Sequence, residues 1–529
     1  MKGRNVTIRI PLTLLLTACT SSAFAQTTPP PPAPVEYYRG NIGHTGVAAE
    51  ALTVPLSLLW RHTTLQALSN PASAVYGDST VYFVSGEFVY AVHSSDGTVK
   101  WRYPSVAKPG TVYATTPALT GGALYVTDDN GQVAKLESAT GHELWTKDLH
   151  CAIRSAPIVS GGIVYFGGGN GHCYALSADS GGTVWEETTD GAVTTSPTIT
   201  GGLVVFTSGD NNVYSLSART GHKAWSLPFE ADPSVLPVVY DGSTLYVTAG
   251  DTIYGLDPAN RAQRSKLTLP TNLAQPPTIS RDSLYVVTQT NLLYSLTLAG
   301  RARWHITLNG VATAPPLLAG NLVLVATQSG IVSGYESGSG KLVWQYVMQA
   351  TATDSQPKYT SANVYAAPIL AGGTLYVVSD DGSLSAFRSD ASDHIGPQLT
   401  QLVPESGGFV PSEGLSYGAY LVDEGTGIDP ATVILALDGA VTAKASYIPA
   451  QNAIYDTPTT PLKEGRHQIT VKASDWRGNS TTQSWSFTVD DHPLAATGQP
   501  GGLNPNDPRY QGGGRNPNVP PPPPPIVPF

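Results

Sequence analysis

The chain has 529 residues, a formal net charge of −10 and only 13% charged residues, about half the share found in an average soluble protein. No cluster of Lys and Arg appears along it, which excludes the basic footprint of a nucleic-acid-binding protein. The 54 Gly and 43 Pro residues favour many short strands joined by turns.

The first 25 residues have the pattern of a secretory signal. Basic residues precede an apolar run over 10–18, which is too short to span a bilayer because a spanning helix needs about 20 apolar residues. Two maturation sites remain open. LTAC at 16–19 resembles a lipobox, which would make Cys19 a lipidated first residue, whereas AFA at 23–25 resembles an ordinary signal-peptidase site. Either interpretation predicts export, with membrane contact only through a lipid anchor.

A repeat of about 40 residues follows the signal. Its clearest marker is a turn that ends in Trp, such as TGHELW at 140–145 and TGHKAW at 220–225. Each unit has four short apolar segments separated by Gly, Asn and Asp, which is typical of antiparallel strands joined by tight turns. The tryptophans that mark the units are Trp60, Trp101, Trp145, Trp185, Trp225, Trp304 and Trp344, and Ser265 stands where one is missing.

Four-stranded repeats of this length are typical of propeller blades. Eight units are counted, so we expect an all-β fold with an eight-bladed β-propeller over 37–396. The eighth unit lacks a Trp strand, whereas Trp60 precedes the first unit, so the N-terminal strand is expected to complete the eighth blade. We expect each indole to pack between neighbouring blades, because it is broad and apolar and its N–H needs a carbonyl acceptor.

These repeats resemble PQQ-like β-propeller repeats, the family of the quinoprotein dehydrogenases and of the outer-membrane assembly lipoprotein BamB. YYRGNIGHTGVA at 37–48 also resembles the segment that precedes such propellers in bacterial envelope proteins. For the dehydrogenases, the resemblance implies PQQ, calcium, a catalytic carboxylate and, in alcohol dehydrogenases, two adjacent cysteines. This chain has three cysteines, none of them adjacent, and no CxxCH haem motif. We therefore expect no PQQ or other cofactor, no metal, no catalytic residue and no enzymatic activity.

Cys151 and Cys173 are expected to lie on one face of the propeller, in connections that emerge on the same side of the blades. In an exported protein such a pair predicts a disulfide. Two alternatives remain open: a zinc site formed with the adjacent His150 and His172, or two free thiols.

Two connections on that same face, at 102–116 and 345–367, are longer than the others. Loops carry binding function more often than strands do. We therefore expect this face to contact a partner, and the alternative is a long loop without function. The residues assigned to the partner face are Tyr113, Asp354, Lys358 and Tyr359.

Beyond the repeats, alternation in TVILAL, HQITVKASD and QSWSFTV predicts strands. Residues 397–490 resemble a bacterial Ig-like module, which implies a β-sandwich. Residues 491–529 are rich in Pro and Gly and predict a disordered or polyproline II tail, while 26–36 form a Pro-rich linker.

Together these features predict an exported, monomeric and noncatalytic scaffold that binds a protein partner in the periplasm, at the outer membrane or at the cell surface. Two alternatives remain open. One is a PQQ-dependent quinoprotein dehydrogenase. The other is an extracellular adhesion or carbohydrate-binding protein, which the Ig-like module and the tail would suit.

Overall fold

The computed structural model describes residues 32–64, 66, 72–233, 236–350, 361–442 and 445–492. Within them the structure is almost entirely β-strand, with three short 3-10 segments, η1 (Tyr38–Gly40), η2 (Pro430–Thr432) and η3 (Pro449–Gln451). No helix in this part of the chain is long and apolar enough to cross a membrane.

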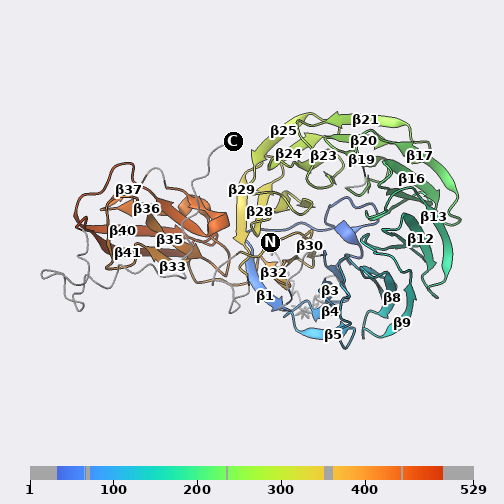
Figure 1. The fold of residues 1–529 in the computed structure, drawn as a ribbon, viewed down its shortest axis with the longest axis horizontal. Helices are drawn as coiled ribbons and strands as arrows, with labels where there is room; N and C mark the ends of the chain where they lie inside the picture. The colour runs from blue at the N-terminus through green and yellow to red at the C-terminus, as the bar shows by residue number, and fades with distance from the viewer. Residues whose placement is uncertain are drawn as a thin grey trace, which may run out of the picture. The chain divides into compact units, whose positions relative to one another are not determined.

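Four-stranded antiparallel sheets fill residues 57–388, and Figure 1 shows them arranged about a common axis in chain order. In seven of these sheets, four consecutive strands form a meander. Their strands are β2 (Val75–Gly77), β3 (Thr80–Ser85), β4 (Phe88–His93), β5 (Val99–Tyr103), β6 (Ala118–Thr120), β7 (Ala123–Thr127), β8 (Gln132–Glu137), β9 (Glu143–Asp148), β10 (Ile158–Ser160), β11 (Ile163–Gly167), β12 (His172–Ser177), β13 (Thr183–Thr188), β14 (Thr198–Thr200), β15 (Leu203–Thr207), β16 (Asn212–Ser217), β17 (Lys223–Pro228), β18 (Val239–Tyr240), β19 (Leu245–Ala249), β20 (Thr252–Leu256), β21 (Gln263–Thr268), β22 (Thr278–Ile279), β23 (Ser283–Val287), β24 (Leu292–Thr297), β25 (Ala302–Thr307), β26 (Leu317–Ala319), β27 (Leu322–Ala326), β28 (Ile331–Glu336) and β29 (Leu342–Val347).

An eighth sheet joins the two ends of the repeat region, in the order β1-β32-β31-β30. Strand β1 (Ser57–Thr63) pairs antiparallel with β32 (Ser383–Arg388), so that Trp60 lies opposite Ala386. The expectation that the N-terminal strand completes the last repeat is confirmed by this pairing. The other two strands of the sheet are β30 (Ile369–Ala371) and β31 (Thr374–Val378).

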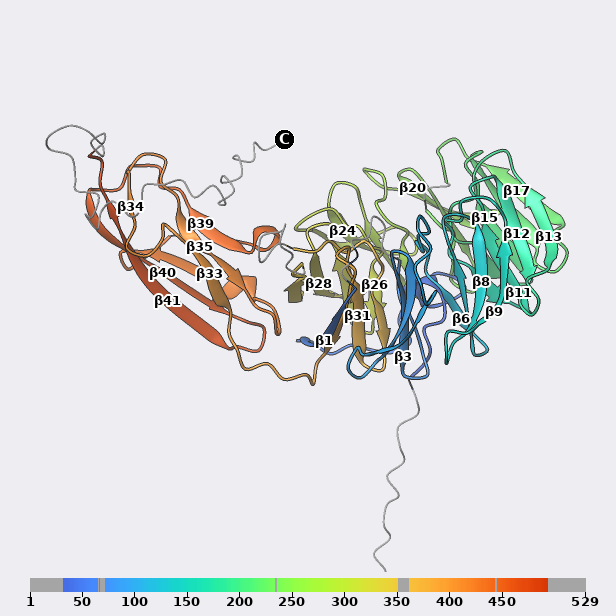
Figure 2. The ribbon, with the colours of Figure 1, turned by 60° about the horizontal axis from the view of Figure 1, so that its bottom comes forward.

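Burial differs between the inner and outer strands of a sheet. Figure 2 shows the course of the strands in a second view. The second strands, such as β11 with the sequence IVYFG, are buried along nearly their whole length. Such strands are apolar on both faces because a neighbouring sheet covers each face. The outermost strand β9, with the sequence ELWTKD, is half buried to exposed throughout, whereas the outermost strand β29, with LVWQYV, is buried over its last four residues.

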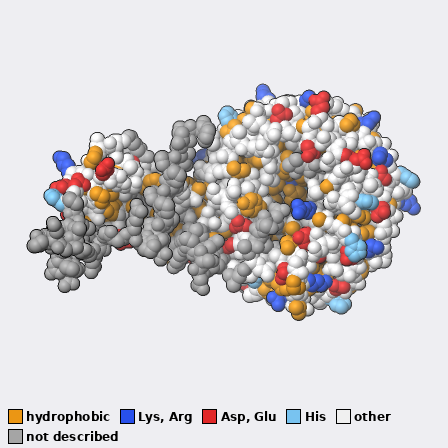
Figure 3. Space-filling model, in the orientation of Figure 1, with side chains coloured by type: hydrophobic (Ala, Val, Ile, Leu, Met, Phe, Trp, Pro, Cys, Tyr) orange, Lys and Arg blue, Asp and Glu red, His pale blue; other side chains and the backbone are white. Residues whose placement is uncertain are grey.

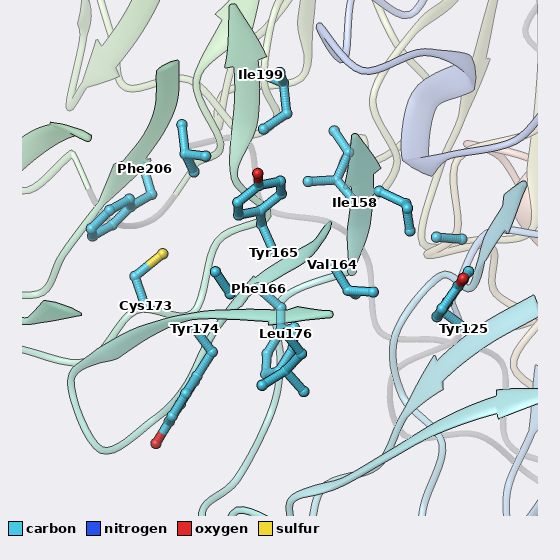
Figure 4. Packing of buried hydrophobic residues seen from close by; sticks show 14 of the residues in the cluster. Tyr125, Ile158, Val164, Tyr165, Phe166, Cys173, Tyr174, Leu176, Ile199 and Phe206 are labelled. Atoms are coloured by element: carbon cyan, nitrogen blue, oxygen red, sulfur yellow. The ribbon is translucent and has the colours of Figure 1, made fainter. Parts of the chain in front are cut away.

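The hydrophobic core is shared between neighbouring sheets. One cluster contains Tyr125 from β7, Phe166 from β11 and Phe206 from β15, which belong to three successive sheets (Figure 4). A single sheet of this kind has two apolar faces and cannot bury both by itself. The sheets therefore depend on one another for stability.

Each indole of the repeat lies against the next sheet along the chain. The Nε1 of Trp145 donates a hydrogen bond to the carbonyl of Ala178 at 3.2 Å, and Trp185 does the same to Ala218 at 2.9 Å. The same bond, from an indole to a carbonyl of the following sheet, is made by Trp60, Trp101, Trp225 and Trp304.

Glycine in the Trp-containing turn has a second role that the sequence pattern did not reveal. Gly181 has φ +70°, and a Cβ placed on it would lie 2.8 Å from a ring atom of Trp145. The indole of one sheet therefore packs directly on the turn glycine of the next. Gly141 stands in the same relation to Trp101, and Gly221 to Trp185.

Beyond the ring, two further sheets share one core that includes Leu421, Ile454, Ile469, Trp485 and Phe487. Their orders are β33-β35-β39-β38 and β34-β41-β40-β36-β37. Their strands are β33 (Gln398–Val403), β34 (Phe409–Val410), β35 (Tyr417–Val422), β36 (Ile434–Leu437), β37 (Ala440–Val441), β38 (Tyr447–Ile448), β39 (Ala453–Asp456), β40 (Gly465–Ser474) and β41 (Ser480–Val489).

We expect Trp145→Ala to lower the free energy of unfolding by about 3–5 kcal/mol, the range for truncating a large packed aromatic residue. The loss combines a cavity between two sheets with the removal of one of the two side-chain hydrogen bonds to the carbonyl of Ala178, which keeps its bond from the hydroxyl of Tyr125. Urea denaturation followed by circular dichroism measures it. Leu144→Ala, at a 51% exposed neighbouring position, is the control and should change stability by less than about 0.5 kcal/mol. Equal effects of the two substitutions would contradict the packing role.

A matched pair of glycines tests the indole contact separately from backbone strain. Gly181 and Gly161 both have positive φ, but a Cβ on Gly161 would meet nothing within 4 Å. Both alanine variants lose about 1 kcal/mol through the left-handed backbone. Only Gly181→Ala also displaces an indole, so its melting temperature should fall clearly further than that of Gly161→Ala. Identical melting temperatures would show that the contact adds nothing.

Candidate functional site

The segment 35–50 follows the inner strands of the repeat region and touches all eight of its sheets. In Figure 1 it is the blue ribbon within the ring of sheets. Backbone hydrogen bonds join Val35 to Tyr76, Glu36 to Leu119, Ile42 to Ile199, Gly43 to Tyr240, Thr45 to Ile279 and Gly46 to Leu318. Side chains of the segment form further hydrogen bonds: Tyr37 to the carbonyl of Val159, His44 to the carbonyl of Pro197, and Glu50 to the N–H of Gly373.

A tight local turn gives this segment its curvature. Arg39 in η1 and His44 have φ of 57° and 56°, a left-handed conformation that is uncommon outside glycine. The Oδ1 of Asn41 accepts hydrogen bonds from the N–H groups of Gly43 at 3.0 Å and Thr45 at 3.3 Å. The motif RGNIGHTG therefore forms a bent, internally bonded segment that fits inside a small circle of strands.

His44 holds this bend against the surrounding sheets. Its side chain is buried, and its ring nitrogens lie 3.1 Å from the carbonyl oxygen of Tyr38 and 2.9 Å from that of Pro197. Burial lowers the pKa of His44, so the imidazole is neutral near pH 7 and donates through one nitrogen only. We assign His44 a structural role.

Arg39 is the charged group at the centre of the segment, and it is only 3% exposed. Its Nη2 donates to the carbonyl of Pro277 at 3.0 Å and to the Oγ1 of Thr278 at 2.9 Å. Burial lowers the pKa of Arg39 to about 10, which leaves the guanidinium protonated at neutral pH. Gly46 makes this placement possible, because a Cβ there would lie 2.4 Å from Nη2.

A cavity of about 370 Å³ lies beside Arg39, between residues 33–50 and the inner strands β26 and β30. Its walls are mainly hydrophobic, with Leu317 and Ile369 from the two strands. Arg39 and Glu50 are the charged residues that line it. The cavity thus combines an apolar wall with a buried cation.

A second polar cluster lies where the two C-terminal sheets meet the ring. Trp476 donates from its Nε1 to the carbonyl of Gln345 in β29 at 2.9 Å. Arg477 donates from Nη2 to the carbonyls of Ser389 and Ala391 at 2.6 and 2.8 Å, and from Nε to the hydroxyl of Ser57. Both side chains come from the DWRGN turn between β40 and β41 and hold that turn on the ring.

Three carboxylates gather at this junction. Asp393, Asp423 and Asp475 each offer an oxygen, and these oxygens lie within 4.8 Å of one another. Asp423 accepts from the N–H groups of Gly425 and Gly427. Its burial, reinforced by the two neighbouring carboxylates, raises its pKa to about 6.

Turn formation explains why these acids are present. Asp475 accepts from the N–H groups of Arg477 and Asn479 at 2.8 Å, and Asp393 accepts from the hydroxyl of Thr426 at 2.7 Å. Each acid therefore shapes a turn that meets the other part of the chain. The three aspartates therefore form a polar contact between the ring and the C-terminal sheets, and Asp423 is the member whose pKa is raised.

The expected disulfide between Cys151 and Cys173 is absent, and both are free cysteines. Cys173 is fully buried in the core, while the Sγ of Cys151 lies 4.0 Å from the hydroxyl of Tyr174. Successive residues of a strand point to opposite faces, and Figure 4 shows Cys173 and Tyr174 on opposite sides of β12. The two thiols consequently face different sides of the sheet. Burial raises the pKa of both.

The zinc alternative for these cysteines finds no support in the described residues either. The groups of metal-ligating side chains found there are the three aspartates of the junction and an exposed group formed by Glu464, Asp490 and His492. Neither group contains His150 or His172.

The predicted partner face is only partly within the described residues. Asp354, Lys358 and Tyr359 lie outside them, as does the predicted lipidation residue Cys19. Tyr113 is 3% exposed and its ring packs against Tyr103. It belongs to the core, so its assignment to a binding surface is wrong.

Sequence reasoning missed an exposed hydrophobic residue of this connection. Val106 is 76% exposed and lies in the long connection between β5 and β6. The available signal was that Val106 is an apolar residue in a loop that also contains Lys108 and Tyr113. The sequence pattern does not show whether such a residue is buried or exposed.

Charged side chains form no concentrated patch on the face drawn in Figure 3. Lys, Arg, Asp and Glu are scattered singly around the ring, and hydrophobic side chains line a hollow near its middle. This distribution suits contacts that rest on shape and apolar area more than on a strong electrostatic field.

The family profile described as outer membrane protein assembly factor BamB matches residues 57–156, 87–176, 129–237 and 229–418. Together these matches span 57–418, more than half of the chain. Among curated proteins, the serine/threonine-protein kinase AfsK of Streptomyces griseus is 37% identical over 70 residues, which are 13% of this chain and 9% of the kinase. The match thus spans a small part of both proteins.

Solved structures with the same fold include an assembly factor and an enzyme. BamB from Moraxella catarrhalis is 16% identical, with a TM-score of 0.52 over 65% of this chain and 100% of that one. Quinohemoprotein alcohol dehydrogenase from Comamonas testosteroni is 15% identical, with a TM-score of 0.56 over 70% of this chain and 82% of that one. At these identities the similarity establishes the β-propeller fold alone.

The raised pKa of Asp423 predicts that stability falls as pH rises. Its folded pKa of about 6 exceeds the unfolded value of 3.8, so its contribution is complete below about pH 4 and is lost as pH rises through 6. Asp423→Asn keeps an oxygen acceptor for the turn but cannot ionise. Between pH 4 and 7 its free energy of unfolding should drop less than that of the wild type, by on the order of 1–3 kcal/mol.

Urea denaturation at several pH values measures this difference. Asp179→Asn is the matched control, since the side chain of Asp179 is 99% exposed. It should follow the wild type at every pH. Parallel curves for wild type and Asp423→Asn would show that Asp423 is already ionised throughout this range.

Proposed function

The chain belongs to the family described as outer membrane protein assembly factor BamB, and we propose that it is a noncatalytic scaffold that binds a protein partner in the bacterial envelope. The observation that carries this proposal is the match of the family profile across 57–418. On this proposal, residues 37–396 are an eight-bladed propeller and 397–490 an Ig-like module. The chain is exported by its N-terminal signal and acts as a monomer.

The composition of the cavity beside Arg39 supports a role without PQQ. The calcium ion that accompanies PQQ requires about six to eight oxygen ligands. Among the residues that line the cavity, Glu50 is the acidic one, and it already accepts from the N–H of Gly373 at 3.0 Å. Segment 35–50 also takes up space along the axis. These residues do not fit a calcium–quinone pair, so we derive no reaction through it.

A quinoprotein dehydrogenase is the alternative, because quinohemoprotein alcohol dehydrogenase has the same fold. This alternative requires bound quinone and a catalytic carboxylate on the ring. Adhesion or carbohydrate binding at the cell surface is a third possibility, to which the C-terminal sheets would contribute.

The connection between β5 and β6 is the surface that we assign to the partner. Tyr113 anchors it by donating from its N–H to the carbonyl of Gly86 at 2.9 Å, and Val112 donates to the carboxylate of Asp129 at 2.9 Å. Val106 stands exposed on this anchored loop. A loop already held in one conformation loses less entropy on binding, which favours an apolar contact here.

Capture from envelope extracts with the purified full chain, followed by chemical cross-linking and mass spectrometry, tests the scaffold. We expect one or a few envelope proteins to be recovered reproducibly. Val106→Asp should reduce their recovery at least about tenfold, because a charge replaces an apolar contact. Leu144→Asp introduces the same charge at an exposed position on an outermost strand and should leave recovery unchanged. Equal recovery by both variants would remove this loop from the interface.

A second measurement separates the scaffold from the dehydrogenase. Purified protein is incubated with PQQ and calcium, and its absorption spectrum and dye-linked oxidation of alcohols are recorded. We expect neither retained quinone absorbance nor dye reduction above the protein-free control. Quinone that stays bound through gel filtration, together with substrate-dependent dye reduction, would replace the scaffold proposal with the enzyme.

A further inference from the structure

Arg39 has more hydrogen-bond donors than the protein around it satisfies. A guanidinium carries five N–H donors, and the two polar contacts of Arg39, with Pro277 and Thr278, both use Nη2. Its Nε and Nη1 are buried and have no protein acceptor. Three N–H donors of a residue that lines the cavity are thus left without a protein acceptor.

The positive charge of Arg39 is equally unmatched. The salt bridges among the described residues do not include Arg39. Glu50, which lines the same cavity, is bonded to the backbone of Gly373 instead. A buried cation without a partner is costly, and a negatively charged ligand would offset that cost.

The cation is held in place rather than free to leave the cavity. Thr278 binds Nη2 at 2.9 Å, and Gly46 leaves just enough room beside it. The left-handed backbone at Arg39, with φ 57°, fixes the direction of the side chain at its base. A charged group that is pre-positioned in this way loses little side-chain freedom when a ligand binds.

The cavity itself favours an organic ligand over a bare inorganic ion. Its volume of about 370 Å³ falls within the usual range of small-molecule pockets, about 300–1,000 Å³. Val47, Ala48, Leu317 and Ile369 contribute apolar walls. We propose that the cavity beside Arg39 binds a small organic carboxylate, with the carboxylate on Nε and Nη1 and an apolar body against these walls.

Isothermal titration calorimetry of the full chain with three probes tests the ligand class. Hexanoate has the proposed carboxylate and apolar body, hexanamide lacks the charge, and inorganic phosphate lacks the apolar body. We expect hexanoate to bind at least about tenfold more tightly than hexanamide, since hydrogen bonds between charged groups are the stronger kind. Phosphate should bind more weakly than hexanoate. Absence of hexanoate binding, or preference for phosphate or hexanamide, would overturn the proposal.

Substitutions locate the site. Arg39→Gln should abolish or weaken hexanoate binding at least about tenfold, while Arg219→Gln, which removes an exposed arginine from another sheet, should leave it unchanged. Unchanged affinity in Arg39→Gln would overturn the assignment.

A second variant keeps the test decisive if Arg39→Gln does not fold. Ala49→Leu retains Arg39 and narrows the cavity from an exposed position on its wall. With a melting temperature close to that of the wild type, it should bind hexanoate at least about tenfold more weakly than the wild type. Wild-type affinity in this folded variant would place hexanoate elsewhere and overturn the proposal.

Discussion

The contact between an indole and the turn glycine of the next sheet is the constraint on which the ring depends. Trp145 both lies on Gly181 and bonds the carbonyl of Ala178, so one side chain fixes the spacing and the orientation of two sheets. The contact recurs at Gly97, Gly141, Gly221 and Gly340, whereas Arg261 stands at the equivalent turn position for Trp225. Where Ser265 replaces the indole, Leu267 packs on Gly300 instead. At this position, apolar packing on a glycine is therefore kept although the indole and its hydrogen bond are not.

Segment 35–50 is the counterpart of this contact on the inner side of the ring. The indoles join each sheet to its neighbour, whereas this segment touches an inner strand or its first turn in all eight. It thereby couples sheets that have no contact with each other. The bend that allows this course places Arg39 and His44 in left-handed conformations. Such strain is tolerated where surrounding contacts over-determine the backbone, and here it positions a buried cation beside a cavity.

The last indole shows how the repeat pattern is adapted at its end. Trp344 donates to the carbonyl of Leu56, ahead of β1, and to that of Thr426 in the C-terminal part. The joint between the two parts is thus built on the same residue type that joins the sheets. Polar groups, including Arg477 and the three aspartates, surround it. Burial among these groups raises the pKa of Asp423, so we expect the stability of this joint to depend on pH.

The sequence by itself determined the repeat, the strand order within each unit and the pairing of the first strand with the last unit. These features follow from apolar periodicity and from turn residues, which act over a few neighbouring positions. Tertiary structure alone decided which side chains meet across the ring. Cys151 lies beside Tyr174, whose side chain is on the face of the sheet opposite to Cys173, so the two thiols do not meet. Tyr113 packs against Tyr103 although it lies in a long loop. The cavity beside Arg39 could not be predicted from the motif RGNIGHTG, because its walls include strands more than 200 residues away along the chain.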